Sequence, residues 1–201
     1  MERSNETITV WGTMIAGLMA ISDYPFSSKS VFELSKKCDV IILRFDVYSG
    51  NYDIFENCIR ICDCDRFYIE SIDKWNRWNW RQELIASLDD IKPEYVLFPD
   101  SDESYDISFD NEFEEFKNSK KDLMMFDYEM KTIDNRNVEK YPKARHCKVF
   151  RWEKEMTYYP YKGYAIPNYK NRQPSMFMAV SKINHFCFWT KEMERKKILH
   201  R

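Results

Sequence analysis

The sequence predicts an α/β fold with a mostly parallel central sheet flanked by helices. In its first half, runs rich in β-branched and aromatic residues alternate with segments of helical spacing. Strands that alternate with helices of about 10–15 residues are typical of βαβ units. The run "DVIILRFDV" is hydrophobic almost throughout, as expected of a strand buried on both faces of a parallel sheet. A chain of 201 residues is long enough for one sizeable core.

The elements of the first half follow one another in a regular order. Strands are expected at residues 7–16, 39–47, 66–71 and 94–100, and helices at 27–38, 52–62 and 72–91. Ser27 can cap the first helix, and Pro93 closes the last one because proline cannot continue a helix. Ligands in such sheets bind beyond the carboxyl ends of the strands, where Asp46 and Asp100 fall.

The second half is less regular. Strands are expected at residues 122–130 and 147–156, an aromatic-rich loop at 158–175, and a short strand or turn leading into a basic helix at 185–201. No linker interrupts the chain, so residues 1–103 and 104–201 are expected to share one core in a single domain.

Bulk composition excludes several classes of protein. The net charge of −2 gives no overall attraction to nucleic acid or acidic membranes. The longest apolar run, residues 8–21, is too short to span a bilayer, and "MERSNET" is a poor start for a signal peptide. We therefore expect a cytoplasmic protein whose six cysteines are reduced. The spacing in "CIRICDC" could hold zinc, but no matching second pair follows.

The stretch "YVLFPDSDE" places three carboxylates directly after a hydrophobic run. Two like charges about 4 Å apart repel by roughly 1 kcal/mol in water and about 4 kcal/mol at an effective dielectric of 20. A divalent cation bound by Asp100 and Asp102 would offset this repulsion, and hard cations prefer such oxygen ligands. The alternative is a solvated turn. An EF-hand is excluded because Tyr105 stands where that loop needs glycine.

Arg81 lies on an apolar helical stripe with Trp78, Ile85 and Leu88. An arginine in that position needs a partner. It could extend to solvent or pair with a structural carboxylate. It could also point into the cleft toward a phosphate or the acidic turn, because its planar fork suits phosphate oxygens.

Further candidates are scattered along the chain. Asp46, at a strand end, could bind a ribose or base, or cap the following turn. His185 lies in the apolar run "INHFCFWT" and is either a core residue or a third ligand for an ion such as Mn²⁺. Lys191 and the basic residues at 195–197 form either a solvated helix face or a cover for an anionic leaving group.

Several segments together resemble glycosyltransferases of the A-type fold, close to family 2. They are "ITVWGTMIAG", "IILRFDVYSGN", "WNRWNWRQELIASLDDIKPEYVLFPDSDE" and "INHFCFWTKEMERKK", which span most of the chain. The resemblance implies the nucleotide-diphospho-sugar transferase fold and a nucleoside-diphospho-sugar donor. It also implies that residues 1–103 bind the donor and residues 104–201 the acceptor.

The resemblance further implies a site. Mn²⁺ or Mg²⁺ would bridge the donor's diphosphate to Asp102, with Asp100 nearby and His185 completing the metal shell. Asp46 would face the nucleoside, and Arg81 would lie beside the diphosphate. The expected activity is metal-dependent transfer of a sugar to an acceptor hydroxyl, on a glycan or on a modified base in DNA. The aromatic segment 158–175 could contact the acceptor or simply pack the second half.

The chain departs from the family in one respect. It lacks the glutamate–aspartate pair that many members place after the D-x-D motif for the general base. Asp127, Glu129 and Glu153 are the available substitutes. This departure motivates an alternative, a non-catalytic protein that binds a nucleotide or glycan. A nucleotidyltransferase would need a glycine- and lysine-rich loop after the first strand, where this chain reads "MIAGLMAISDYPF".

Overall fold

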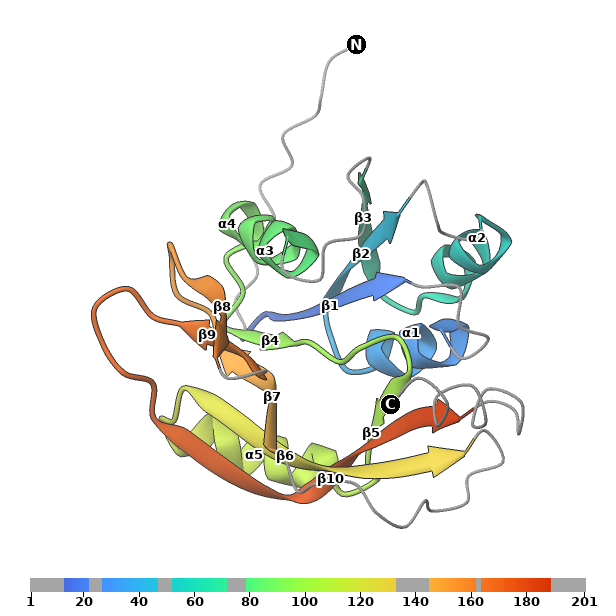
Figure 1. Cartoon of the computed structure of the whole chain (residues 1–201). Helices are drawn as coiled ribbons and strands as arrows, with labels where there is room; N and C mark the ends of the chain where they lie inside the picture. Colours follow the sequence, from blue (N-terminus) through green and yellow to red (C-terminus); the bar gives the residue numbers. More distant parts are fainter. Residues whose placement is uncertain are drawn as a thin grey trace.

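The computed structural model describes residues 13–21, 27–46, 52–71, 79–132, 145–161 and 164–188 (Figure 1). The strands are β1 (Ile15–Ile21), β2 (Val40–Asp46), β3 (Asp65–Ser71), β4 (Tyr95–Leu97), β5 (Glu103–Tyr105), β6 (Leu123–Thr132), β7 (Arg145–Arg151), β8 (Thr157–Tyr161), β9 (Tyr164–Asn168) and β10 (Met176–Phe188). The helices are α1 (Ser27–Ser35), α2 (Tyr52–Ile61), α3 (Asn79–Ala86), α4 (Leu88–Ile91) and α5 (Phe109–Asn118).

In the described part of the chain, an eight-stranded sheet has the order β3-β2-β1-β4-β7-β6-β10-β5. The first four of these strands are parallel, as the alternating sequence pattern predicted. Strand β7 then runs antiparallel to both β4 and β6. Strand β10 is parallel to β6 and antiparallel to β5. Both halves of the sequence therefore contribute strands to the same sheet.

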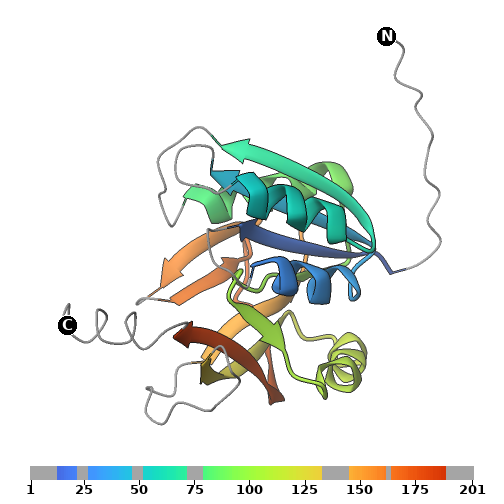
Figure 2. The ribbon, with the colours of Figure 1, turned by 90° about the vertical axis from the view of Figure 1, so that its right-hand side faces the viewer.

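Hydrophobic side chains fill both faces of this sheet. One core cluster contains residues of α1, α2 and α5, and the other contains residues of α3, α4 and the two-stranded β8–β9 sheet. Strand β1 supplies both, because Leu18 belongs to the second cluster and its neighbour Met19 to the first. Figure 2 shows α1 and α2 side by side over the parallel strands.

Element boundaries differ from the sequence prediction at several places. Strand β1 begins at Ile15, later than expected, and residues 1–12 lie outside the described part. The predicted helix 72–91 is divided at Ser87, whose hydroxyl donates to the carbonyl of Leu84 at 2.7 Å. It ends at Ile91, just before Pro93, as expected.

The second half holds the larger corrections. Helix α5 and strand β5 were not predicted. The first part of the expected loop at 158–175 is instead the antiparallel pair β8–β9. Both strands contain a proline, Pro160 and Pro167, which a two-stranded sheet tolerates because its edges are free. Strand β10 begins at Met176, well before the short strand or turn expected at 185.

A β-bulge in β7 places one residue of the site. Met124 of β6 pairs with Val149, whereas the next residue, Met125, pairs with Cys147. Lys148 is therefore the extra residue in its strand. Its carbonyl accepts hydrogen bonds from Phe98 N at 2.8 Å and from the Tyr105 hydroxyl at 2.9 Å. Bulges bend a strand and change the direction of a side chain, and they are frequent beside active sites.

A second bulge interrupts β10. Between two paired positions, β10 advances four residues, from Met178 to Lys182, while β6 advances two, from Met125 to Asp127. The carboxylate of Glu112 in α5 accepts hydrogen bonds from the backbone of residues 180 and 181 at 2.9 and 2.7 Å. Helix α5 thereby satisfies backbone donors that the bulge removes from the ladder.

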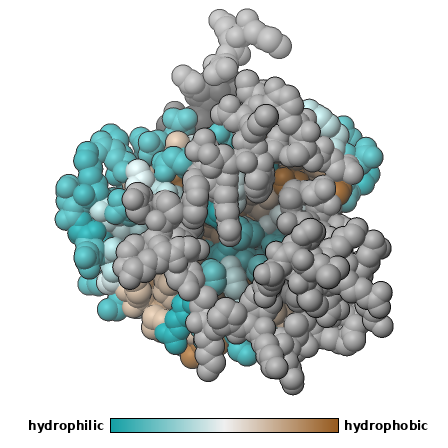
Figure 3. All heavy atoms as spheres, viewed as in Figure 1, coloured by the Kyte–Doolittle hydropathy of each residue, from teal (hydrophilic) through white to brown (hydrophobic). Residues whose placement is uncertain are grey.

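Hydrophilic residues predominate among the coloured atoms on the face seen in Figure 3. Within the described ranges, no helix is long and apolar enough to cross a membrane.

Candidate active site

The candidate site lies at the carboxyl end of β4, where ligands bind in sheets of this kind. The chain leaves the core there through Phe98 and Pro99 and turns at Ser101 and Asp102. The backbone N–H of Glu103 closes the turn by donating to the carbonyl of Asp100 at 3.0 Å. Side chains from α3, β7 and β10 converge on this turn.

Asp100 is held by two cations. One of its carboxylate oxygens lies 2.9 Å from Nη2 of Arg81, and the other lies 2.9 Å from Nζ of Lys148. Burial alone would raise the pKa of Asp100, but the charges of Lys148 and Arg81 outweigh it and hold that pKa well below its usual range. Asp100 is therefore an ionised carboxylate with both oxygens already occupied by positive charge.

Glu103 is completely buried beneath the turn. Its Oε2 accepts hydrogen bonds from Lys148 Nζ and from the backbone N–H of Asp100, each at 2.8 Å. Burial raises the pKa of Glu103; Lys148 opposes this, and the charge of Asp100 adds to it. Burial would lower the pKa of Lys148, but the two carboxylates outweigh it and raise that pKa. Lys148 thus remains charged between two acids.

Arg81, which lies on an apolar helical stripe, has a carboxylate partner in Asp100. It is buried, and its guanidinium lies 4.1 Å from the ring centroid of Trp80 while its end reaches Asp100. The Trp80 ring packs edge-on against Phe98, and Phe98 in turn packs against Tyr158 of β8. Arg81 therefore pairs with the acidic turn and is positioned by an aromatic wall. Trp78 lies outside the described residues.

Asp102 meets His185. Strand β10 pairs with β5 so that His185 lies opposite Glu103, and the N–H of Phe186 donates to the carbonyl of Asp102 at 2.8 Å. Nε2 of His185 is then 3.3 Å from Oδ2 of Asp102, and Nδ1 is 3.7 Å from Oε1 of Glu103. Burial would lower the pKa of His185, but the interaction with Asp102 outweighs it and raises that pKa.

The Asp102–His185 pair fits a divalent cation. Two ligands that bind one ion at about 2.1 Å and at right angles are about 3 Å apart, close to the observed separation of 3.3 Å. Histidine ligands commonly donate a hydrogen bond from their other nitrogen to a carboxylate. Here Nδ1 faces Oε1 of Glu103 at 3.7 Å, which is longer than a hydrogen bond. Among the described residues no group of three or more potential ligands gathers, so substrate and water oxygens would complete the shell.

The other predicted site residues lie elsewhere or outside the described part. Strand β2 ends at Asp46, whose side chain is not described, and Lys191 is not described either.

Among the predicted general bases, Asp127 pairs with Arg145 at 3.3 Å, Glu129 with Lys131 at 3.4 Å, and Glu153 with Arg172 at 2.9 Å. Tyr128, whose ring is 5.1 Å from that of His185, separates Asp127 and Glu129 along β6. Because side chains alternate along a strand, Asp127 and Glu129 lie on the face of β6 opposite to Tyr128.

Lys148, Glu103 and Tyr128 were not singled out from the sequence. Lys148 gave a usable signal, because it is a charged residue within the apolar run "HCKVF", as Arg81 is on its stripe. Its neighbours Cys147 and Val149 are both buried. Glu103 was counted among the three carboxylates of the acidic turn, but its burial, like the position of Tyr128, depends on contacts between strands distant in the sequence.

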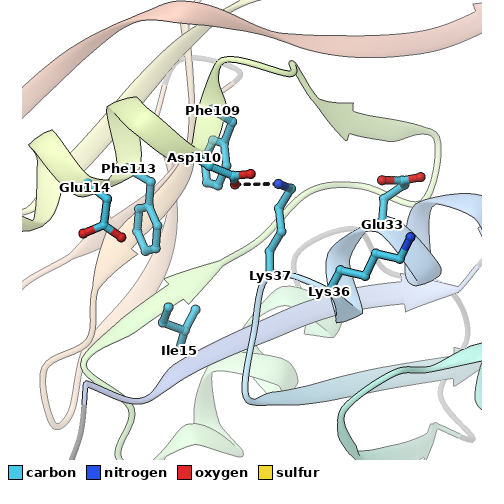
Figure 4. A pocket seen from close by; sticks show the side chains of 8 residues that line it. All are labelled: Ile15, Glu33, Lys36, Lys37, Phe109, Asp110, Phe113 and Glu114. Atoms are coloured by element: carbon cyan, nitrogen blue, oxygen red, sulfur yellow. Dashed lines mark hydrogen bonds and ion pairs between the residues drawn. The ribbon is translucent and has the colours of Figure 1, made fainter.

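A separate pocket of about 390 Å³ lies between α1, α5 and the start of β1 (Figure 4). Phe109 and Phe113 line it together with charged side chains, and Lys37 and Asp110 form an ion pair across it. Its described lining includes none of the predicted site residues. This pocket is therefore separate from the acidic turn.

Comparison with known proteins supports the fold. No family model and no curated protein matches the chain. HddC from Yersinia pseudotuberculosis is similar in structure, with a TM-score of 0.51 and 11% identity over 91% of this chain and 97% of that one. Its complex with GMP-PN gives a TM-score of 0.52 at 11% identity over the same shares. The inositol-1-phosphate CTP transferase of T. maritima gives 0.50 at 12% identity, over 94% of this chain and 95% of that one.

At such low identity these similarities establish the fold alone. The chain has the nucleotide-diphospho-sugar transferase fold, which confirms the expectation from its sequence.

Proposed function

We propose that the chain is a metal-dependent glycosyltransferase that moves a sugar from a nucleoside-diphospho-sugar to an acceptor hydroxyl. The observation that carries the proposal is the approach of Asp102 and His185 to 3.3 Å beside two buried cations, Arg81 and Lys148. A pair of metal ligands beside fixed positive charge suits a diphosphate, which needs both a divalent cation and cationic hydrogen-bond donors.

Asp102 and His185 would hold Mn²⁺ or Mg²⁺, with Asp100 close by. When bound, the ion supplies electrostatic stabilisation of the negative charge that develops on the departing diphosphate. Arg81 adds to this from α3, because its guanidinium is fixed between the Trp80 ring and Asp100. Positive charge arranged before the reaction is usually the largest catalytic contribution. Asp46 would bind the nucleoside, and Lys191 would cover the diphosphate.

One carboxylate would accept the acceptor's proton as general base. Asp127, Glu129 and Glu153 remain the candidates. Glu153 lies in the loop after β7 and pairs with Arg172 beyond β9, so it borders the aromatic segment proposed to contact the acceptor. That acceptor is a glycan or a modified base in DNA.

Two other functions compete with this one. The T. maritima protein of similar fold is a nucleotidyltransferase by name. Against that function, the connection between β1 and α1 in this chain reads "SDYPF", which contains neither glycine nor lysine for a phosphate loop. A non-catalytic binder is the second rival, because the general base has no obvious position.

The products distinguish the three functions. We would incubate the protein with Mn²⁺ and a panel of nucleotide sugars and separate the products by chromatography. Release of nucleoside diphosphate supports the glycosyltransferase. Pyrophosphate released from a nucleoside triphosphate and a sugar phosphate supports the nucleotidyltransferase. Binding with neither release, even with acceptors present, supports the binder and rejects our proposal.

Two variants assign the activity to the site. Asp102→Asn and His185→Asn should each lower diphosphate release by at least about 100-fold, since each removes a ligand of the charge-stabilising ion. Asp110→Asn and His146→Asn are the matched controls, because Asp110 pairs with Lys37 beside the separate pocket and the ring of His146 stacks on Tyr128. Equal losses in the controls would show that the site is not the one proposed.

A further inference from the structure

Two cysteines lie close together at the amino ends of β2 and β3, at the opposite end of the strands from the acidic turn. Cys38 immediately precedes Asp39 and β2, and Cys64 immediately precedes β3. Their Sγ atoms are 3.9 Å apart. The five cysteines whose side chains the structure describes are all free thiols, so this pair is reduced.

The two thiols differ in their surroundings. Cys38 is buried, with its Sγ 3.2 Å from the carbonyl of Leu34 and packed against the backbone of β1 at Gly17. Cys64 lies in the turn between α2 and β3 and is only half-buried. One thiol is thus accessible from solvent, and the other lies behind it within reach of its sulfur.

We propose that Cys38 and Cys64 form a dithiol site that hydrogen peroxide oxidises to an intrachain disulfide. The Cys64 thiolate attacks one oxygen of the peroxide, the O–O bond breaks, and the departing hydroxide takes up a proton to form water. Cys38 then loses its proton and attacks the sulfur of the Cys64 sulfenic acid. The S–S bond forms, the S–O bond breaks, and the second hydroxide leaves as water. The two thiols lose two electrons, which the peroxide gains.

Cys64 is the attacking residue for two reasons. It is the more exposed of the two, and the hydrogen bond with Cys38 lowers the pKa of Cys64. Burial and the nearby charges of Asp63, Asp65 and Asp39 oppose this effect without reversing it. Thiolate character and access together decide which cysteine reacts with peroxide.

Two of the other described thiols, Cys58 and Cys147, are less suited to the reaction. Burial raises the pKa of Cys58 to about 11, and its Sγ lies 3.7 Å from the hydroxyl of Ser28. Cys147 is buried in the second core cluster, and burial raises its pKa to about 12. The pairing of Cys38 with Cys64 should therefore be selective.

Peptide mapping tests the proposal on the full chain. The folded protein would be treated with a few equivalents of hydrogen peroxide, quenched in acid, alkylated and digested. We expect loss of two of the six thiols and a single linked peptide pair joining Cys38 to Cys64. Cys64 should lose its free thiol at least about tenfold faster than Cys147. Dithiothreitol should restore both thiols.

Variants make the result specific. Cys64→Ser and Cys38→Ser should each abolish the linked pair, while Cys58→Ser should leave it unchanged; circular dichroism verifies that each variant is folded. In protein unfolded with urea, the selectivity for this pair should disappear. Linkage among other cysteines, linkage between chains, or further oxidation of Cys64 to the sulfinic acid without a bond to Cys38 would each overturn the proposal. None of these measurements depends on transferase activity.

Discussion

The ammonium group of Lys148 lies 2.8 Å from a carboxylate oxygen of Glu103 whose side chain has no exposed surface. The same ammonium lies 2.9 Å from Asp100. The repulsion among the acids of the turn is therefore offset, at least in part, by cations of the protein itself. The bulge in β7 makes this possible, because it sets Lys148 outside the regular ladder.

Replacing Lys148 by methionine should strongly destabilise the protein. The variant leaves Glu103 and Asp100 in a buried place with one cation fewer, and breaking a buried ion pair costs about 3 kcal/mol or more. Urea unfolding would measure the free energy. Lys182→Met is the matched control, because Lys182 pairs with Glu129 at 3.5 Å on the surface and should change stability by less than about 1 kcal/mol.

The double variant Lys148→Met with Glu103→Gln should recover part of the lost stability, because a neutral amide is less costly to bury than a carboxylate without its partner. If the two substitutions simply add, the coupling between these side chains is absent and this account of the turn is wrong.

Manganese binding should depend on His185. In the presence of a nucleoside diphosphate, His185→Asn should weaken Mn²⁺ binding by at least about tenfold, since it removes one of the two proposed protein ligands. Electron paramagnetic resonance of free Mn²⁺ gives the affinity directly. His146→Asn serves as the control, because His146 stacks on Tyr128 at 3.9 Å between ring centroids. Equal affinity in both variants would remove His185 from the metal site.

Gly17→Ala should destabilise the fold. A Cβ at this position would lie 2.9 Å from Sγ of Cys38 and 3.1 Å from Cγ of Leu34. Overpacking of this kind costs about 1–3 kcal/mol. The double variant Gly17→Ala with Cys38→Ala should lose less than the sum of the single variants, because it removes the closest contact. Thermal and urea unfolding of the four proteins complete the cycle, and strict additivity would contradict the predicted clash.

Asp122 should make stability depend on pH below neutrality. Burial alone would raise its pKa, but hydrogen bonds from Arg172 and Ser175 outweigh it and lower that pKa below its usual range. A carboxylate with a depressed pKa in the folded state stabilises the fold above its unfolded pKa of about 3.9. That stabilisation is lost as pH falls through the folded value.

The stability gap between the wild type and Asp122→Asn should therefore be full above about pH 5 and shrink progressively below pH 4. Urea titrations from pH 7 to pH 2.5 would follow it. Arg172→Leu should reduce the same pH-dependent part, because it removes one of the groups that lower the pKa. A difference in unfolding free energy that is constant across this pH range would refute a depressed pKa for Asp122.

The parallel part of the sheet was predictable from the sequence because β1, β2 and β4 are buried on both faces. β2 is hydrophobic almost throughout, and helices such as α1 and α2 lie between strands at the expected places. Helix α5 also carried a signal, since Phe109, Phe113 and Phe116 recur at helical spacing and are all buried. That pattern was obscured by the acidic residues between them.

Strand β10 was largely missed for a different reason. Its first residues are partly exposed, and the bulge near Val180 breaks the two-residue alternation by which strands are recognised. In the candidate site, Arg81 and the acidic turn were predictable because charge appears where hydrophobic residues are expected. The meeting of Lys148 with Glu103 could not be predicted, since it depends on the register of β7 and β4 across a long sequence separation.

The irregularity in β10 also constrains how the strand can change. Between Met178 and Lys182, β10 has two residues more than β6. Because this number is even, even-numbered side chains point to the same face of the sheet before and after the bulge. A single-residue deletion whose shift is carried into the regular ladder beyond Lys182 would turn the remainder of the strand over and carry the imidazole of His185 away from Asp102. Deleting two would return it. A change of one residue at this point of the chain is therefore tolerable only where the bulge itself absorbs it, as the bulge in β7 absorbs Lys148.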